Sequence, residues 1–121
     1  YDNKPMKGDW NGAGMHTNFS TNDTRNPSRG KEAIQNAIDN LRESHSKHIE
    51  VYGEGLADRL TGAHETCSIK EFKSGVSHRG ASIRIPLTTA KKGYGYFEDR
   101  RPGANSDPYL VSARLIESVC L

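Results

Sequence analysis

Residues 79–101, RGASIRIPLTTAKKGYGYFEDRR, contain the two stretches that decide the fold. In the first, apolar side chains occupy every second position from Ala81 to Ile85, and Pro86 ends the alternation. The tyrosine-rich segment over residues 94–101 has the same period. A period of two is typical of β-strands, so this part of the chain predicts two strands.

Two segments have features of helices. Residues 31–52 carry side chains spaced by three and four on one helical face, at Ile34, Ile38, Leu41, His45, His48 and Tyr52. Gly53 supplies a stop for this helix. Asp107 followed by Pro108 is a typical helix start, so a second helix is expected over residues 108–120.

Two other segments also lead to structural expectations. Residues 13–21 alternate like a further strand. Residues 53–68 contain three glycines and neither period, so we expect a loop, and a loop of that length is often functional.

Composition limits what the chain can be. Leu, Ile, Val and Phe make up only about 17% of the 121 residues, below the roughly 20% that usually accompanies a self-sufficient core. We therefore expect another stretch of polypeptide or a neighbouring subunit to complete the core. The net charge of +2 argues against a nucleic-acid partner, and no apolar run approaches the length of a membrane span. The two distant cysteines predict free thiols in a reducing, cytoplasmic compartment.

The polar faces of the expected strands carry the residues with chemical potential. His16, Asn18 and Ser20 share one face of the first strand, as Tyr96, Glu98 and Arg100 do in the last. A structural histidine and a solvated salt bridge are the simpler interpretations of these faces. Side chains that could bind carboxylate or phosphate groups are Arg59, Arg79, Arg84 and Arg100. For any one of them alone, a surface charge is the simpler interpretation. His45 and His48 are expected to be core or interface residues rather than metal ligands.

Taken together, five segments resemble glutamine synthetases of the eukaryotic type (class II). They are residues 8–21 (GDWNGAGMHTNFST), 59–66 (RLTGAHET), 79–86 (RGASIRIP), 95–102 (GYFEDRRP) and 107–109 (DPY). The resemblance covers roughly residues 3–119. It implies the C-terminal portion of a catalytic domain with an α+β fold, a mainly antiparallel sheet backed by helices 31–52 and 108–120. The first half of that domain and the N-terminal β-grasp domain lie outside these 121 residues.

The resemblance also implies a reaction. Glutamate and ammonia are joined at the expense of ATP, through a γ-glutamyl phosphate, in a ring-shaped homo-oligomer. His16 and Glu98 would bind the divalent metal, Mg²⁺ or Mn²⁺, that bridges the ATP phosphates. The residues implied along the nucleotide are Asn18, Phe19, Ser20, Arg79, Arg84 and Tyr96.

Other positions are implied to bind glutamate or to act in the reaction. The implied glutamate-binding residues are Asp9, Trp10, Gly12, Gly14, Arg59 and Arg100. Arg79 and Arg84 would neutralise charge on the transferred phosphoryl group. Glu65 would close over the acyl phosphate, exclude water and take a proton from the attacking ammonium. His78 departs from the family, which usually has Asn or Asp there.

Two further hypotheses compete with a fragment of a ligase that is inactive alone. One is a non-catalytic, truncated paralogue that acts as a nucleotide-binding or assembly module. The other is a small metal-binding domain built on the five histidines. Descent from an active enzyme is favoured by the intact residues Arg59, Glu65, Arg79, Glu98 and Arg100.

Overall fold

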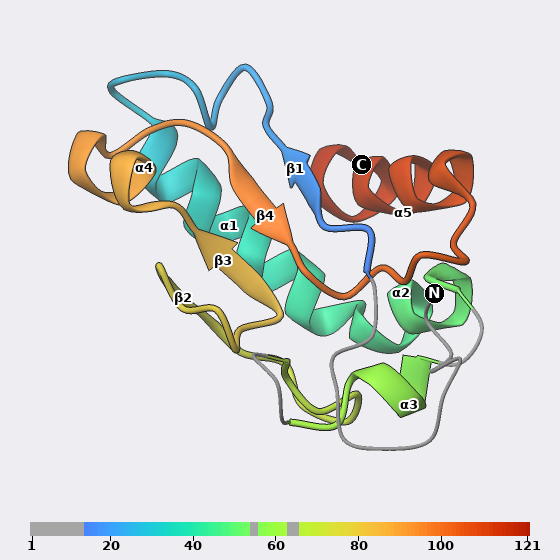
Figure 1. The fold of residues 1–121 in the computed structure, drawn as a ribbon. Helices are drawn as coiled ribbons and strands as arrows, with labels where there is room; N and C mark the ends of the chain where they lie inside the picture. The colour runs from blue at the N-terminus through green and yellow to red at the C-terminus, as the bar shows by residue number, and fades with distance from the viewer. Residues whose placement is uncertain (1–13, 54–55, 63–65) are drawn as a thin grey trace.

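The computed structural model describes residues 14–53, 56–62 and 66–121, apart from the side chains of residues 58 and 59. At its centre (Figure 1), four strands lie in the order β1 (Thr17–Phe19), β4 (Phe97–Asp99), β3 (Ile83–Ile85) and β2 (Ser74–Val76). β4 is antiparallel to both neighbours, whereas β2 runs parallel to β3. The prediction of an α+β fold with a mainly antiparallel sheet is confirmed.

Helices accompany this sheet in the described part of the chain. They are α1 (Gly30–Glu43), α2 (His45–Val51), α3 (Leu56–Arg59), α4 (Leu87–Lys92) and α5 (Pro108–Cys120). In Figure 1, α1 runs behind β3 and β4, and α5 lies on the side of β1. α5 packs against both α1 and α2.

The core lies between the sheet and these helices. α1 buries Ile34, Ala37, Ile38 and Leu41, which is the face its spacing predicts. They form one cluster with Ile83 and Phe97 of the sheet and with Val111 and Leu115 of α5. The sheet therefore has one face covered by helices and one face free to carry polar groups.

The helix expected over residues 31–52 is interrupted, so that expectation is wrong at Ser44. The Ser44 hydroxyl donates to the carbonyl oxygen of Asn40 at 2.8 Å, and the helix restarts at His45. A serine side chain that bonds the preceding turn in this way competes with the backbone pattern and bends helices. At this break the Ser44 hydroxyl also lies 2.9 Å from the Ser118 hydroxyl of α5.

The helix at residues 108–120 is confirmed with its expected start. The Asp107 side chain accepts a hydrogen bond from the Tyr109 N–H at 2.9 Å, and Pro108 occupies the first turn. Three other elements are not in the expectation: α4, β2 and the short α3, which lies inside the expected 53–68 loop. Cys67 is buried and Cys120 exposed, both as free thiols, as predicted.

Candidate functional site

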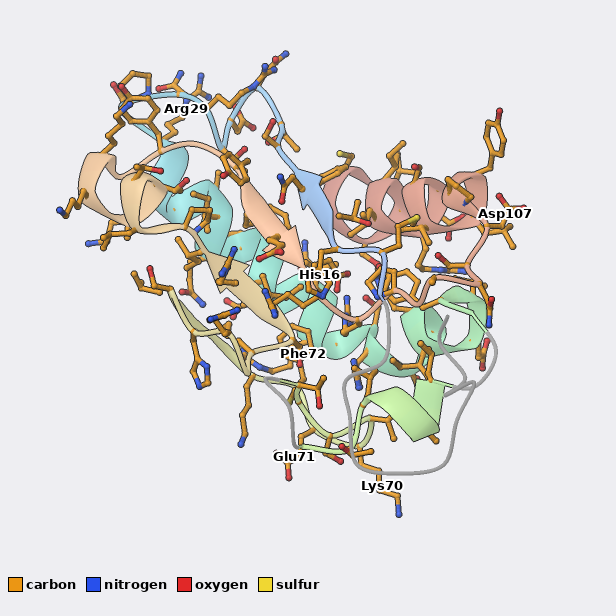
Figure 2. The ribbon with its side chains drawn as sticks, in the orientation of Figure 1. His16, Arg29, Lys70, Glu71, Phe72 and Asp107 are labelled. Atoms are coloured by element: carbon orange, nitrogen blue, oxygen red, sulfur yellow. The ribbon has the colours of Figure 1, made fainter. Side chains whose placement is uncertain are left out.

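A cluster of charged side chains gathers around Glu98 at the middle of β4. Glu98 is only 6% exposed. Its Oε1 lies 3.2 Å from His16 Nδ1, and its Oε2 lies 2.7 Å from Arg84 Nε and 3.4 Å from Arg100 Nη1. The Arg84 contact is an ion pair without the alignment of a hydrogen bond. Figure 2 shows His16 beside the end of β4.

Strand register brings these side chains together from distant parts of the sequence. Asn18 of β1 and Arg84 of β3 both stand opposite Glu98 in the ladders. Directly opposed residues point to the same face of a sheet, as do residues two apart on one strand. His16, Asn18, Arg84, Glu98 and Arg100 therefore occupy the face away from the core, and the shared faces expected in the first and last strands become one surface.

Electrostatics explain why Glu98 tolerates its burial. A carboxylate removed from water is costly unless charges and hydrogen bonds compensate it. Here two guanidinium groups flank one oxygen and an imidazole flanks the other. This cluster can bind a cation between the imidazole and the carboxylate. Alternatively, its arginine side chains can turn from Glu98 and bind an anion.

The other residues expected along the nucleotide do not all lie on the same face of the sheet. Tyr96 is 43% exposed, and Ser20 follows β1 with its side chain half-buried. The Phe19 ring packs on the core face, with its centroid 5.8 Å from that of Phe97. The Phe19 ring therefore lies on the face of the sheet opposite the Glu98 cluster.

Two further expected residues lie outside the four strands. Arg79 is exposed in the turn before β3. Gly14 pairs with Gly103 in an antiparallel bridge, which places it beside the segment that follows β4. Asp9, Trp10, Gly12 and Glu65 lie outside the described residues, and so does the side chain of Arg59.

His78, expected above to depart from the usual Asn or Asp, has a clear local role. Its Nδ1 accepts a hydrogen bond from the Gly80 N–H at 3.1 Å, two residues further along the chain. Asn and Asp side chains make the same kind of contact in turns. The His78 side chain therefore bonds the backbone of the turn that leads to Arg84.

A second polar cluster, absent from the expected site residues, lies on the opposite side of β4. Asp99 and Arg101 are both buried, and the Arg101 Nη2 lies 2.8 Å from the Asp99 Oδ2. The run of four charged residues at 98–101 contains the signal that could have found them. Because a strand alternates, two of four consecutive charged residues must point toward the core beside Phe97.

Within the described ranges, no group of three or more His, Cys, Asp or Glu side chains could hold a metal ion. None of the helices in that part of the chain is long and apolar enough to cross a membrane.

Comparison with known proteins gives relatives over nearly the whole chain. No family model matches it. It is 58% identical over 117 residues to a glutamine synthetase of Candida glabrata and 57% identical over 117 residues to that of Saccharomyces cerevisiae. It is also 57% identical over 120 residues to the glutamine synthetase cytosolic isozyme 1-2 of Oryza sativa subsp. japonica.

These alignments cover 97% of the chain against the two yeast proteins and 99% against the rice protein. They cover only 31% of each yeast protein and 33% of the rice protein. The chain thus spans about a third of the length of the curated relatives it matches. Over that length, the chain is similar to one stretch of these glutamine synthetases.

Proposed function

We propose that the complete protein containing residues 1–121 is a glutamine synthetase, an ATP-dependent glutamate–ammonia ligase that works through γ-glutamyl phosphate. These residues would supply the C-terminal portion of its catalytic domain, in a cytoplasmic, ring-shaped homo-oligomer. The identity of 57–58% to the relatives named above supports this proposal. The observation that carries it is the four-residue arrangement of His16, Arg84, Glu98 and Arg100.

The donor chemistry of His16 and Glu98 fits a divalent cation. Their facing atoms are 3.2 Å apart, close to the roughly 3 Å between neighbouring ligands of an octahedral ion whose bonds are about 2.1 Å long. An imidazole and a carboxylate suit Mn²⁺ and are compatible with Mg²⁺. We infer that these two residues hold the cation that neutralises ATP phosphates, and that its other ligands come from outside the described residues.

The arginines suit the negative charge of the proposed reaction. Phosphoryl transfer depends mainly on positioning and on stabilising charge at the phosphoryl oxygens. Arg84 lies against Glu98 and is about a third exposed, so it could turn from that carboxylate to a phosphoryl oxygen. Arg79 is proposed to act with it, and Arg100 is proposed to bind a carboxylate of glutamate with Arg59.

The remaining assignments rest on the family resemblance. Glu65 would act as the base for ammonium, and Asp9, Trp10, Gly12 and Gly14 would border glutamate. Asn18, Phe19, Ser20 and Tyr96 would lie along ATP, with Phe19 contributing backbone atoms.

Glutamine formation by the complete protein, with and without the Glu98→Gln substitution, tests the proposal. Glu71→Gln is a matched control, because Glu71 is an exposed carboxylate whose ion pair with Lys73 lies in a different part of the structure. We expect the unsubstituted protein and the control to make glutamine, and Glu98→Gln to lose about 10²-fold or more. A wild-type protein that binds ATP but makes no glutamine at any metal concentration would instead support the non-catalytic alternative.

A further inference from the structure

A chain of buried hydrogen bonds runs from α5 to the residue beside Glu98. Its end on β4 is Asp99, whose side chain is fully buried and accepts hydrogen bonds from Arg101 and from Tyr52. The Arg101 backbone N–H is 3.0 Å away, its Nε 2.9 Å and its Nη2 2.8 Å, and the Tyr52 hydroxyl is 2.7 Å away. Both carboxylate oxygens are therefore used.

The direction of each proton in this chain follows from Tyr52. A phenol has one hydrogen, and Tyr52 gives it to Asp99. The contact of 2.5 Å between His48 Nδ1 and the same hydroxyl must then be donated by His48. A neutral imidazole with its proton on Nδ1 has an acceptor at Nε2, so the Ser118 hydroxyl donates to it at 2.6 Å. Ser118 Oγ then accepts in its 2.9 Å contact with the Ser44 hydroxyl, which shares its one proton between Ser118 and the Asn40 carbonyl oxygen.

The electrostatics agree with a neutral His48. Burial, helped by the nearby charge of Arg101, lowers the pKa of His48 from 6.5 to about 3. Burial also raises the pKa of Tyr52, so the phenol keeps its proton. Burial alone would raise the pKa of Asp99, but the charge and hydrogen bonds of Arg101, with the Tyr52 hydroxyl, outweigh it and lower that pKa.

His45, one turn earlier, has the opposite tautomer. Arg101 Nη1 can only donate, so His45 Nδ1 accepts from it at 2.9 Å, and His45 Nε2 donates to the Ile69 carbonyl oxygen at 2.9 Å. The two histidines therefore serve different partners, and only His48 joins α5 to Tyr52.

We propose that His48 is a positioning residue for Glu98: from α2 it holds the Tyr52 hydroxyl in its hydrogen bond with Asp99, the next residue of β4. The inference rests on the proposed function, because it assigns Glu98 to metal and nucleotide binding. Neither His48 nor Tyr52 lies on the open face of the sheet, since both belong to the buried side.

The physical link is the short backbone between Asp99 and Glu98. Adjacent residues of a strand point to opposite faces, so an Asp99 side chain fixed from behind also fixes the direction in which Glu98 leaves the strand. Substitution of the residues that orient metal-binding side chains commonly changes metal affinity or activity by 10- to 100-fold. We expect an effect at the lower end of that range, because His48 acts through two intermediates.

Three substitutions at one position separate this role from a purely structural one. His48→Asn keeps an N–H close to the position of Nδ1 and should still donate to Tyr52. His48→Gln keeps a polar group nearer Nε2 and Ser118 instead, and His48→Leu keeps neither contact. Leu115→Ala serves as a matched control, because it removes a buried side chain of α5 that is not part of the hydrogen-bond chain.

The readout is the dissociation constant of Mn²⁺–ATP, measured by titration calorimetry on the complete protein. We expect the constant to rise about 10-fold in His48→Leu and His48→Gln, and to stay within about 2-fold of wild type in His48→Asn and Leu115→Ala. The inference is overturned if His48→Leu binds like wild type, if His48→Asn binds as weakly as His48→Gln, or if Leu115→Ala is equally weakened.

One further measurement covers a variant that fails to fold. If His48→Leu does not fold, the ¹⁵N spectrum of the wild-type imidazole decides: a proton on Nδ1 supports the chain, and a proton on Nε2 overturns it. Failure of the proposed function looks different, because the wild-type protein itself would then neither bind Mn²⁺–ATP nor make glutamine, and the positioning role would fall with it.

Discussion

Glu98 and Asp99 are neighbours in β4, yet their carboxylates serve opposite faces of the sheet. Glu98 meets His16, Arg84 and Arg100 on the open face, whereas Asp99 is fully buried against Arg101 and Tyr52. Both acidic groups are compensated by arginines, but only Glu98 has an accessible imidazole beside it. One strand therefore carries the proposed site on one side and its anchor on the other.

His16→Ala tests whether the imidazole acts through a metal. If His16 is a ligand, ATP binding by the complete protein should weaken more at low than at saturating Mg²⁺, because excess cation compensates for a lost ligand. The KM for ATP, measured over a range of free Mg²⁺, gives the result. Arg29→Ala, an exposed side chain whose 3.8 Å contact with Asp23 lies outside the cluster, is the control. An equal loss at all metal concentrations would contradict the ligand assignment.

Gly30→Ala should destabilise the fold by close contact. A Cβ built at Gly30 would lie 2.5 Å from the Tyr94 Cβ and 2.6 Å from the Thr24 carbonyl oxygen. Neither neighbour is the end of a flexible chain, so we expect a loss of about 1–3 kcal/mol in the free energy of unfolding. Asn36→Ala, an exposed change in the same helix, should stay within about 0.5 kcal/mol. Urea unfolding compares the two.

Acid should weaken the fold through His48. Its pKa is about 3 when folded and 6.5 in the reference state, so the unfolded chain binds the proton first as the pH falls. Stability from this group is fully present above about pH 6.5 and declines toward pH 3. Urea midpoints at pH 7 and pH 5 measure the slope, which His48→Asn should reduce. Leu115→Ala removes no titrating group and should keep the wild-type slope; equal slopes in all three proteins would contradict the prediction.

Periodicity predicted the elements that local sequence determines. The alternation around Ile83 and the cap at Asp107 led to β3 and α5, and the shared faces of His16 and Glu98 were both observed. Alternation alone could not say that Arg84 would stand opposite Glu98, because strand order depends on contacts between distant segments.

The missed features have physical reasons of the same kind. β2 is only Ser74–Val76, and its pairing with β3 identifies it more clearly than its composition does. α4 has no apolar period; Pro86 precedes it and Gly93, with φ +80°, ends it. The spacing of apolar residues continues past Ser44, although the helix is interrupted there. This spacing indicates only which face is buried, and it does not reveal a side-chain hydrogen bond to the backbone such as that of Ser44.

The 121-residue chain by itself should make no glutamine. His16 and Glu98 are two proposed ligands of one cation, and two ligands hold a divalent ion weakly. The chain also spans only about a third of its relatives. Glutamine formed by the purified chain is measured against a buffer control, with the complete protein as positive control. Formation above the buffer level would contradict the proposed dependence on residues elsewhere in the protein.

Glu65→Ala gives the sharpest test of the proposed chemistry. In the proposal, Glu65 acts only after the acyl phosphate has formed, so its removal should spare the binding of ATP and glutamate. Loss of a positioned general base costs about 10²- to 10⁴-fold in rate. An acyl phosphate exposed to water is hydrolysed, so phosphate release should continue while glutamine formation falls.

The ratio of phosphate released to glutamine formed, measured in one reaction of the complete protein, therefore separates two roles for Glu65. If Glu65 is a base that also excludes water, its replacement by Ala should raise that ratio and leave the melting temperature unchanged. If Glu65 is only a structural residue, its replacement should lower the melting temperature and reduce the formation of both products at a constant ratio. Glu71→Ala, which removes an exposed carboxylate paired with Lys73, should leave ratio and rate as in wild type. A constant ratio with a lowered melting temperature in Glu65→Ala would contradict the proposed role.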